Sequence, residues 1–351
     1  MTKSDGNRSY TQMFNKGVDL SDFNTLGISA NALLYTEIKG KEQLSELAAS
    51  GFFELESWFV FGGGSNVLFK SNLDRAVIRM AISGIRVTEE SDKEVRVQMG
   101  AGEDWHGIVE WAVNRNYGGI ENLALIPGTA GAAPIQNIGA YGAELADVFE
   151  ELELYNPELK KFQILNKEEC RFGYRDSIFK HELKGKTIIT GITLRLTKSG
   201  HAVNSSYASL ENYLEERGVD KPQIKDVFEA VVDVRKSKLP DPELIGNAGS
   251  FFKNPVIGQQ TYQTLKKRYS EMPSFRMENN LYKIPAGWLI EKTGWKGKRI
   301  GNVGCYKNQA LVIVNHGGAT GEEIMKFAAG VQKSVSDKFG IDLVPEVNII
   351  D

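Results

Sequence analysis

The sequence predicts a fold that mixes helices and strands in about two domains. The chain has 351 residues, which is enough for two domains of ordinary size and a substantial core. Strand-like runs dominate the block from residue 76 to about 196. The chain closes on a strand–helix–strand pattern, with a strand at 310–314, a helix at 321–339 and a strand at 343–350.

The elements are expected in the following order. The first 18 residues are polar and predict a mobile lead-in. Strands at 32–36 and 58–61 flank a helix near 42–50, and further strands follow at 76–78, 95–97 and 187–196. Helical spacing of apolar residues from Trp105 to Val113 predicts a helix that Gly118 ends. A Lys- and Glu-rich helical stretch surrounds 210–238, and Thr320, Glu323 and Gly340 supply the caps of the last helix.

Composition excludes several classes of function. The net charge of −3 argues against bulk binding to nucleic acid or to an anionic membrane. Cys170 and Cys305 form no C-x-x-C pair and the four histidines are scattered, so we expect no disulfide framework and no metal site. The start of the chain lacks the apolar region of a signal peptide, and no apolar run approaches the ~18 residues of a membrane span. We expect a cytosolic protein.

The uncharged segment 126–142, IPGTAGAAPIQNIGAYG, is the most informative stretch. Its prolines and glycines weaken any regular strand, whereas Ile126, Ile135, Ile138 and Tyr141 require a packed environment. Small residues on an ordered, non-repetitive backbone let main-chain N–H groups approach a ligand. The alternative is a tight glycine-rich turn between two elements.

A second glycine-rich segment, 62–66, follows the strand at 58–61 and is a natural nest for phosphate oxygens. It fails the dinucleotide fingerprint G-x-G-x-x-G, because Val67 stands where the third glycine is needed. A glycine-rich hairpin is the alternative. Two such segments about 60 residues apart can hold one extended dinucleotide from both sides, and a flavin is the better candidate because the nicotinamide fingerprint is absent.

Three side chains are candidates for chemistry. Arg175 carries a fork that binds carboxylate or phosphate, although a surface pair with Asp176 is the common alternative. Ser250 follows small residues and precedes two aromatics, which suits the edge of a dry cavity or a turn that closes a helix. Glu346 lies in the apolar last strand, where burial would perturb its pKa, unless the strand is an exposed edge as Pro345 permits.

Two short strings match parts of the penicillin-binding signature. They are S-x-x-K at 177–180 and K-T-G at 292–294. The S-x-N element is missing between them, so we reject this interpretation.

Taken together, these residues resemble the UDP-N-acetylenolpyruvoylglucosamine reductase (UDP-N-acetylmuramate dehydrogenase) family. The matching segments run in family order and cover 24–27, 62–69, 126–142, 170–180, 238–254, 286–290 and 345–347. The layout is similar to the longer subtype, which carries a tyrosine on a loop between the flavin and substrate parts, and Tyr207 is the match. Asn348 stands where relatives often carry arginine, which puts any extra cation there in doubt.

The resemblance implies an α+β fold class: a two-lobed FAD-binding fold of the vanillyl-alcohol-oxidase type plus a C-terminal α+β substrate-binding domain. The expected FAD-binding domain is 19–200, with lobes at roughly 19–73 and 74–200. The substrate-binding domain is 201–351, and its last strand is expected to return toward the FAD domain.

The resemblance also implies a function. NADPH, as co-substrate, reduces a non-covalent FAD, which then reduces UDP-N-acetylglucosamine enolpyruvate to UDP-N-acetylmuramate for the cell wall peptidoglycan. The expected enzyme is a cytoplasmic monomer that binds neither nucleic acid nor membrane.

The resemblance implies the following roles, carried over from the family position by position. Arg175 stabilises the developing enolate with help from Glu346, and Ser250 protonates the adjacent carbon. Tyr207, Lys238, Asn254 and Gln309 bind the substrate. The cofactor-binding residues are Asn24, Thr25, Gly62, Gly63, Gly64, Ser65, Asn66, Ile126, Pro127, Gly128, Thr129, Gly131, Ala132, Gln136, Asn137, Gly139, Ala140, Tyr141 and Gly142.

Two rival classes remain. A flavin oxidase of the same fold would use O₂ and could attach its FAD through His106 or Cys170, although neither lies in a segment that resembles an attachment motif. NADPH consumption without peroxide would exclude it. A non-catalytic nucleotide-sugar sensor would not need Arg175, Ser250 and Glu346 together.

Overall fold

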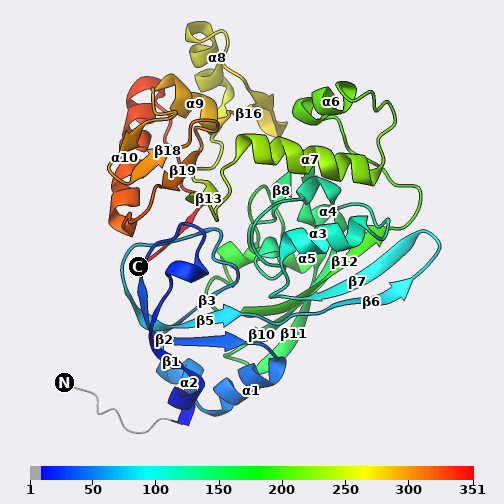
Figure 1. Ribbon diagram of the computed structural model, residues 1–351, viewed down its shortest axis with the longest axis vertical. Helices are drawn as coiled ribbons and strands as arrows, with labels where there is room; N and C mark the ends of the chain where they lie inside the picture. Colours follow the sequence, from blue (N-terminus) through cyan, green and yellow to red (C-terminus); the bar gives the residue numbers. More distant parts are fainter. Residues whose placement is uncertain (1–8) are drawn as a thin grey trace. The chain divides into compact units, whose positions relative to one another are not determined.

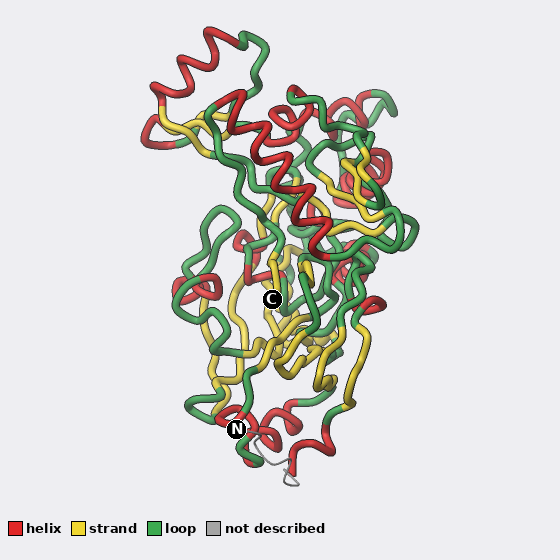
Figure 2. The backbone as a smooth tube through the Cα atoms, turned by 90° about the vertical axis from the view of Figure 1, so that its left-hand side faces the viewer, coloured by secondary structure: helices red, strands yellow, loops and turns green. Residues whose placement is uncertain are grey.

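The computed structural model describes residues 9–351 and divides into two compact units. The first unit comprises residues 9–18, Ala32–Gly63 and Leu73–Arg235. The second comprises Asp19–Asn31, Gly64–Asn72 and Lys236–Asp351. Helices and strands are interspersed along the whole described chain, with irregular segments between them (Figures 1 and 2). The expected mixture of helices and strands is confirmed.

The first unit contains a small sheet with the strand order β1-β2-β5-β3. The central strand β5 pairs in parallel with both of its neighbours, so that Ala76 lies opposite Leu34 on one side and Trp58 on the other. Helices α1 and α2 bury Leu44, Leu47 and Phe52 in the core of this unit. The elements are β1 (Asn15–Asp19), β2 (Asn31–Ile38), α1 (Lys41–Ala49), α2 (Phe52–Leu55), β3 (Trp58–Phe61) and β5 (Leu73–Met80).

The lead-in prediction is wrong for residues 9–18. They form the 3₁₀ helix η1 (Ser9–Met13) and strand β1, because Tyr10 and Phe14 bury their rings against Phe52. The ring centroids lie 5.4 and 4.9 Å from that of Phe52, and Tyr10 is 1% exposed. The remainder of the predicted lead-in, residues 1–8, lies outside the described residues.

A second sheet of the first unit is antiparallel throughout, with the order β11-β10-β12-β7-β6. Helix α3 buries Trp105, Ile108 and Val109 in the same core as Val97 and Leu194 of this sheet. The strands are β6 (Ile85–Glu90), β7 (Glu94–Gly100), β10 (Phe149–Asn156), β11 (Lys161–Asn166) and β12 (Ile188–Thr197), and α3 is Trp105–Val113.

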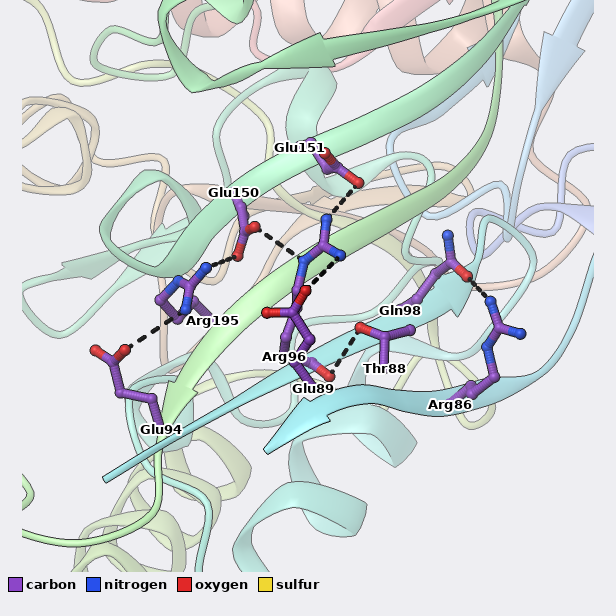
Figure 3. A network of polar contacts seen from close by, with 9 residues as sticks. All are labelled: Arg86, Thr88, Glu89, Glu94, Arg96, Gln98, Glu150, Glu151 and Arg195. Carbon is purple, nitrogen blue, oxygen red and sulfur yellow. Dashed lines mark hydrogen bonds and ion pairs between the residues drawn. The ribbon is translucent and has the colours of Figure 1, made fainter. Parts of the chain in front are cut away.

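Charged side chains link β7, β10 and β12 of this sheet (Figure 3). Arg96 of β7 reaches Glu150 and Glu151 of β10 at 2.9 and 2.7 Å. Arg195 of β12 pairs with the second oxygen of Glu150 at 2.9 Å. Because each cation lies opposite a carboxylate of another strand, the network favours this strand register.

The rest of the first unit consists of short helices and strands and the longer helix α7. The expected helical stretch at 210–238 is two helices, α6 and α7, because Gly218 has a φ of 66° and interrupts it. The elements are η3 (Glu121–Leu123), η4 (Ala133–Ile135), β8 (Gly139–Ala140), β9 (Ala143–Glu144), α4 (Leu145–Val148), α5 (Lys167–Cys170), η5 (Ile178–Lys180), α6 (Ala208–Glu215) and α7 (Ile224–Lys238), whose last three residues belong to the second unit.

The second unit is built on a sheet with the order β13-β19-β18-β17. Helix α10 (Gly321–Phe339) has the predicted caps: Glu323 N donates to Thr320 Oγ1, and Gly340 has a φ of 63°. The other elements are η2 (Ser21–Phe23), β4 (Val67–Phe69), β13 (Gly246–Ser250), β14 (Val256–Gly258), α8 (Gln259–Arg268), β15 (Phe275–Arg276), η6 (Glu278–Asn280), β16 (Leu281–Lys283), α9 (Ala286–Lys292), β17 (Arg299–Ile300), β18 (Val303–Cys305), β19 (Val312–Asn315) and β20 (Asn348–Ile350).

The predicted strand at 343–350 is correct only for its end. Strand β20 pairs in parallel with β4, away from the sheet that holds β19, so the last three elements are no single β-α-β unit. Residues 343–347 instead run beside 251–253, and Pro345, which has no N–H, makes an isolated bridge with Phe252. Within residues 9–351, no helix has the length and apolar character that a membrane crossing needs.

Candidate active site

The first two glycines of the 62–66 segment pack tightly on the 126–142 segment within the first unit. A Cβ at Gly62 would lie 2.1 Å from Thr129 Oγ1, and one at Gly63 would lie 3.3 Å from Gly128 Cα. The hydroxyl of Thr129 is buried and has no hydrogen-bond partner among the described residues. Glycine is therefore required at both positions, by the Thr129 side chain at Gly62 and by the Gly128 backbone at Gly63, and the Thr129 hydroxyl is left available to a ligand.

The other half of the segment belongs to the second unit. A Cβ at Gly64 would lie 2.0 Å from the Phe23 carbonyl oxygen, and Thr25 N donates to Gly64 O at 3.2 Å. The Thr25 hydroxyl, like that of Thr129, is buried without a hydrogen-bond partner in the described chain. Within each unit, a buried threonine hydroxyl beside closely packed glycines is thus without a hydrogen-bond partner among the described residues.

Two predicted cofactor-binding asparagines have structural tasks. The Asn24 amide donates to Leu20 O and Ile28 O at 2.7 and 2.9 Å and accepts from Ile28 N at 3.0 Å. The Asn137 side chain donates to Glu144 Oε2 at 2.7 Å and to Gly173 O at 3.1 Å. Both side chains are nearly saturated, so any contact with a cofactor would come from their backbone.

The remaining residues of the 126–142 segment support its shape. Ile126, Ile135 and Tyr141 are half-buried against the core of the first unit and Ile138 is 6% exposed, which confirms that the segment is packed. A Cβ at Gly131 would lie 2.6 Å from that of Ala101. Other predicted cofactor residues that are half-buried include Ser65, Ala132, Gln136, Gly139 and Ala140, whereas Pro127 and Gly142 are exposed.

The segment 126–142 also orients the side chain of Arg175. Its guanidinium donates to Asn137 O at 3.3 Å and to Gly139 O, and a Cβ at Gly139 would lie 2.9 Å from Arg175 Nη1. Its backbone has a φ of 53°, a left-handed conformation that is uncommon for a residue with a side chain. Asp176 bonds His181 at 2.8 Å instead, so the structure does not favour the surface-pair alternative.

Tyr141 and Tyr207 meet within the first unit. Their ring centroids are 5.3 Å apart with an edge-on geometry. The loop that precedes Tyr207 is held to the segment, because Asn122 Nδ2 donates to both Tyr141 O and Asn204 O, at 3.1 and 2.8 Å. A predicted cofactor residue and a predicted substrate residue are therefore neighbours.

Sequence analysis missed a cation here. Arg235 of α7 donates from Nε to Leu125 O at 3.2 Å, directly before the glycine-rich segment. Burial lowers its pKa, and so does the nearby charge of Arg175. Nothing in the sequence separates Arg235 from the other cations of its Lys- and Arg-rich helix, since its environment depends on distant segments.

Ser250 lies at an irregular point of β13 in the second unit. The pairing register with β19 shifts between Asn247 and Ser250, and Gly249 has a φ of 66°. Such bulges re-aim a side chain next to active sites. Ser250 is exposed, and its hydroxyl has no hydrogen bond to any described residue. The alternative of a turn that closes a helix is wrong, because β13 is a strand.

Glu346 lies beside Ser250 in the second unit. Glu346 N donates to Phe251 O at 2.8 Å, and Asn66 Nδ2 donates to Glu346 O at 3.4 Å. Asn348 uses both its main-chain N and its Nδ2, each 3.0 Å from Asn66 O. The residue that departs from the family pattern therefore holds the glycine-rich turn by hydrogen bonds, without a charge.

Three predicted substrate residues gather in the second unit. Asn254 Oδ1 accepts from Ala286 N at 2.9 Å, where α9 begins. A Cβ at the next residue, Gly287, would lie 3.0 Å from Gln309 Oε1. Asn308 Nδ2 donates to Ser237 O at 3.2 Å, which ties the Gln309 loop to the end of α7 beside the exposed Lys238.

The rejected motifs also have structural tasks. Ser177 is 1% exposed and donates its hydroxyl to Ile135 O at 2.6 Å, while Lys180 donates to Arg175 O at 2.8 Å. His106 accepts from Leu125 N at 3.1 Å. Cys170 is buried, which raises the pKa of its thiol to about 12.

The candidate residues fall on both units. Arg175 and Tyr207 belong to the first, whereas Ser250, Glu346, Lys238, Asn254 and Gln309 belong to the second. That all of them act on one ligand stays a prediction.

Comparison with known proteins gives the family. Residues 241–350 match the UDP-N-acetylenolpyruvoylglucosamine reductase C-terminal domain, and residues 42–158 match an FAD binding domain. A solved UDP-N-acetylenolpyruvylglucosamine reductase from Thermus caldophilus shares the fold, with a TM-score of 0.66, 24% identity and coverage of 96% of this chain and 100% of that one. The predicted fold class is confirmed.

Relatives match almost the whole chain. The UDP-N-acetylenolpyruvoylglucosamine reductase of Flavobacterium johnsoniae is 43% identical over 331 residues, which cover 94% of this chain and 98% of the relative. That of Amoebophilus asiaticus is 44% identical over 335 residues, with coverage of 95% and 98%. At this identity and coverage, the chain belongs to the UDP-N-acetylenolpyruvoylglucosamine reductase family.

Proposed function

We propose that the protein is an FAD-containing oxidoreductase that uses NADPH to reduce UDP-N-acetylglucosamine enolpyruvate to UDP-N-acetylmuramate for peptidoglycan synthesis. Family membership over nearly the full chain and the FAD binding domain match at 42–158 support this activity. One geometric observation gives the proposed activity further support. Phe251, the residue after Ser250, accepts a hydrogen bond from Glu346 N, and Glu346 O accepts one from Asn66 of the glycine-rich turn.

The reduction of an enol ether requires a cation, a second group beside the carboxylate and a proton donor. Hydride addition to the vinyl carbon of an enol ether is easy only if the neighbouring carboxylate takes up charge as an enolate. Bound FAD would supply that hydride. Arg175 would hold both carboxylate oxygens as charge moves onto them, with Glu346 assisting. The Ser250 hydroxyl would then protonate the carbon next to the carboxylate, since an enolate carbon is a strong base.

The two glycine turns are proposed to hold the FAD pyrophosphate and isoalloxazine non-covalently. Unsatisfied hydroxyls of Thr25 and Thr129 and the closely approached backbones of Gly62, Gly63 and Gly64 support this assignment. The nearly saturated side chains of Asn24 and Asn137 argue for backbone contacts at those two positions.

Tyr207, Lys238, Asn254 and Gln309 are proposed to bind the sugar nucleotide, with Tyr207 as the loop tyrosine of the longer subtype. The exposed ring of Tyr207 and the exposed ammonium of Lys238 leave both available to a phosphate-bearing ligand. We further propose that FAD binding is a function of residues 19–200 and substrate binding of 201–351, although the compact units divide the chain at other points.

A cytoplasmic monomer is the proposed state of the enzyme. Sedimentation of the purified protein would measure its mass, and 38.9 kDa is expected for one chain. A dimer mass would contradict the monomer without touching the activity. Cell fractionation would test the location.

The activity is tested by following the flavin. The purified protein should be yellow, and denaturation should release material that chromatographs as FAD. Without oxygen, NADPH should bleach the flavin and the enolpyruvyl sugar nucleotide should restore its colour. Reoxidation by O₂ alone, with peroxide formed, would favour the flavin-oxidase alternative. A colourless protein that FAD cannot reconstitute would overturn the proposal.

A further inference from the structure

Arg235 has more hydrogen-bonding capacity than its surroundings use. Its Nε donates to the neutral Leu125 carbonyl at 3.2 Å. Among residues 9–351, the other N–H groups of its fork have no acceptor, and no carboxylate forms an ion pair with it. An arginine fork carries five donors, so most of the fork is left over.

The position of Arg235 is costly for a cation. The residue keeps some exposed surface, but burial is the largest cause that lowers the pKa of its guanidinium, and the charge of Arg175 lowers it further. Arginine nevertheless stays protonated in proteins. A desolvated cation that lacks a counter-ion of its own is unfavourable. Such a cost is expected where a ligand supplies the anion.

Tyr141 adds a third donor on the same segment. Its O–H makes no hydrogen bond within the described part of the chain, and burial raises its pKa, which the charge of Arg235 partly offsets. Tyr141 has a φ of 49° and lies two residues after Gly139, to which Arg175 donates. Arg175, Arg235 and Tyr141 are thus all attached to the segment 125–141.

We propose that Arg235 and Tyr141 complete, with Arg175, a site in the first unit that binds the carboxylate of the enolpyruvyl group. The inference deepens the proposed function and rests on it. The carboxylate carries one negative charge before hydride addition and a second one as the enolate forms. One guanidinium would balance the single charge of the bound carboxylate. Two guanidinium groups would balance the two charges of the transition state, and stabilisation of the transition state is what accelerates the reaction.

Two ligands that differ in the carboxylate test this site. UDP-N-acetylmuramate carries it and UDP-N-acetylglucosamine does not, while both carry the same nucleotide and phosphates. Titration of the FAD-loaded protein by calorimetry gives both dissociation constants. Arg235→Gln should weaken UDP-N-acetylmuramate about 10- to 100-fold, as expected for a lost charged hydrogen bond, and leave UDP-N-acetylglucosamine unchanged. Arg115→Gln is the control, because Arg115 is exposed and also donates to a main-chain carbonyl, Trp111 O at 3.3 Å.

Other outcomes overturn the proposal. Equal weakening of both ligands would mean that Arg235 binds a phosphate. Unchanged binding of both would mean that Arg235 only supports the Leu125 carbonyl. If Arg235→Gln fails to fold or to retain FAD, Arg235→Lys decides: it keeps the charge and loses the fork, and it should lower the preference for the carboxylate ligand by a smaller factor.

Kinetics separates this proposal from the proposed function. In Arg235→Gln, NADPH should bleach the flavin at the wild-type rate, while the enolpyruvyl substrate should reoxidise it more slowly. A wild-type protein that binds both sugar nucleotides and never reoxidises with the enolpyruvyl substrate would refute the proposed function. Wild-type reoxidation that Arg235→Gln leaves unchanged would refute the role of Arg235 alone.

Discussion

Two groups of arginines in the first unit behave in opposite ways. On the antiparallel sheet, Arg96 and Arg195 each face carboxylates of another strand at 2.7–2.9 Å (Figure 3). At the segment 125–141, Arg175 and Arg235 donate to the main-chain carbonyls of Leu125, Asn137 and Gly139. The sheet arginines are paired with carboxylates, whereas Arg235 donates to a neutral carbonyl.

The difference separates stability from function. An arginine whose fork is occupied by carboxylates contributes to the fold and has little left for a ligand. An arginine that a carbonyl merely orients keeps its charge available in a desolvated place, at a cost in stability. The same contrast applies to hydroxyls: Thr190 donates to Glu153, whereas Thr25, Thr129 and Ser250 have no partner among the described residues.

The largest expected effect is at Ser250. If this unpaired hydroxyl is the proton donor, Ser250→Ala should slow flavin reoxidation by the enolpyruvyl substrate about 10²–10⁴-fold, as is typical of a general acid. Reduction of the flavin by NADPH should be unchanged. Anaerobic stopped-flow absorbance measures both rates. An equal loss in both half-reactions would mean that Ser250 is structural.

Arg175→Lys should come next. Lysine keeps the charge but loses the bidentate geometry, so reoxidation should slow about 100-fold, comparable to the loss of one oxyanion donor. The protein should still fold, bind FAD and be reduced by NADPH. The defect should appear in kcat for the enolpyruvyl step, because the contact strengthens in the transition state. Near-native turnover would remove Arg175 from the catalytic set.

Gly139→Ala tests whether the segment aims Arg175. The new Cβ would lie 2.9 Å from both Arg175 Nη1 and Ala143 O, so the guanidinium must move. A misplacement of about 1 Å can cost up to about 100-fold in rate. We expect reoxidation to slow while the flavin content stays normal. Gly258→Ala, which meets nothing within 4 Å, is the matched control and should have no effect. Equal rates for the two variants would show that Arg175 is placed by other contacts.

Thr129→Val tests whether a buried hydroxyl without a partner binds the cofactor. Its hydroxyl is free for the cofactor, so valine should weaken FAD binding about 3- to 10-fold, as for one neutral hydrogen bond. Fluorescence titration of the apoprotein with FAD measures this. Thr190→Val is the control: its hydroxyl bonds Glu153 Oε1 at 2.6 Å, so stability should fall and FAD affinity should not. The opposite pattern would assign Thr129 to the fold.

Local signals predict the regular elements well. Apolar spacing gives α3 as Trp105–Val113, and the capping residues Thr320 and Gly340 bound α10. The same reasoning fails where the neighbours of a segment are distant in the sequence. Residues 343–347 have the composition of a strand, but their neighbour is the irregular stretch 251–253, and Pro345 cannot continue a ladder. Residues 9–18 are polar, yet two aromatic rings anchor them to Phe52.

The candidate site shows the same limit. The segments 62–64 and 126–142 are recognisable because close backbone approach needs glycine, and Gly63 on Gly128 is such an approach. Whether a given side chain is free for a ligand is not local information. Asn24 and Asn137 occupy motif positions and prove nearly saturated by their neighbours. Arg235 lies in an ordinary Lys-rich helix, and its value depends on Leu125, 110 residues away.

The smallest effect is expected for the sheet arginines, which are paired with carboxylates. Arg96 joins Glu150 and Glu151 across the sheet, and its side chain is 21% exposed. A networked pair of this kind contributes about 1 kcal/mol, so Arg96→Gln should lower the melting temperature by about 2 °C. Arg195 keeps one oxygen of Glu150 occupied, which limits the loss. Neither flavin half-reaction should change, because within residues 9–351 the charged partners of Arg96 and Arg195 all lie outside the segment 125–141.

Arg86→Gln is the control for Arg96→Gln. Arg86 lies on the neighbouring strand, is exposed and bonds the neutral Gln98 at 2.8 Å, so its melting temperature should match that of the wild type. Raised salt should reduce the difference between the two variants, since screening weakens the exposed part of the network. A slowed reoxidation in Arg96→Gln at unchanged stability would break the separation between the two groups of arginines. It would mean that a cation with all its partners on the sheet still acts on the reaction.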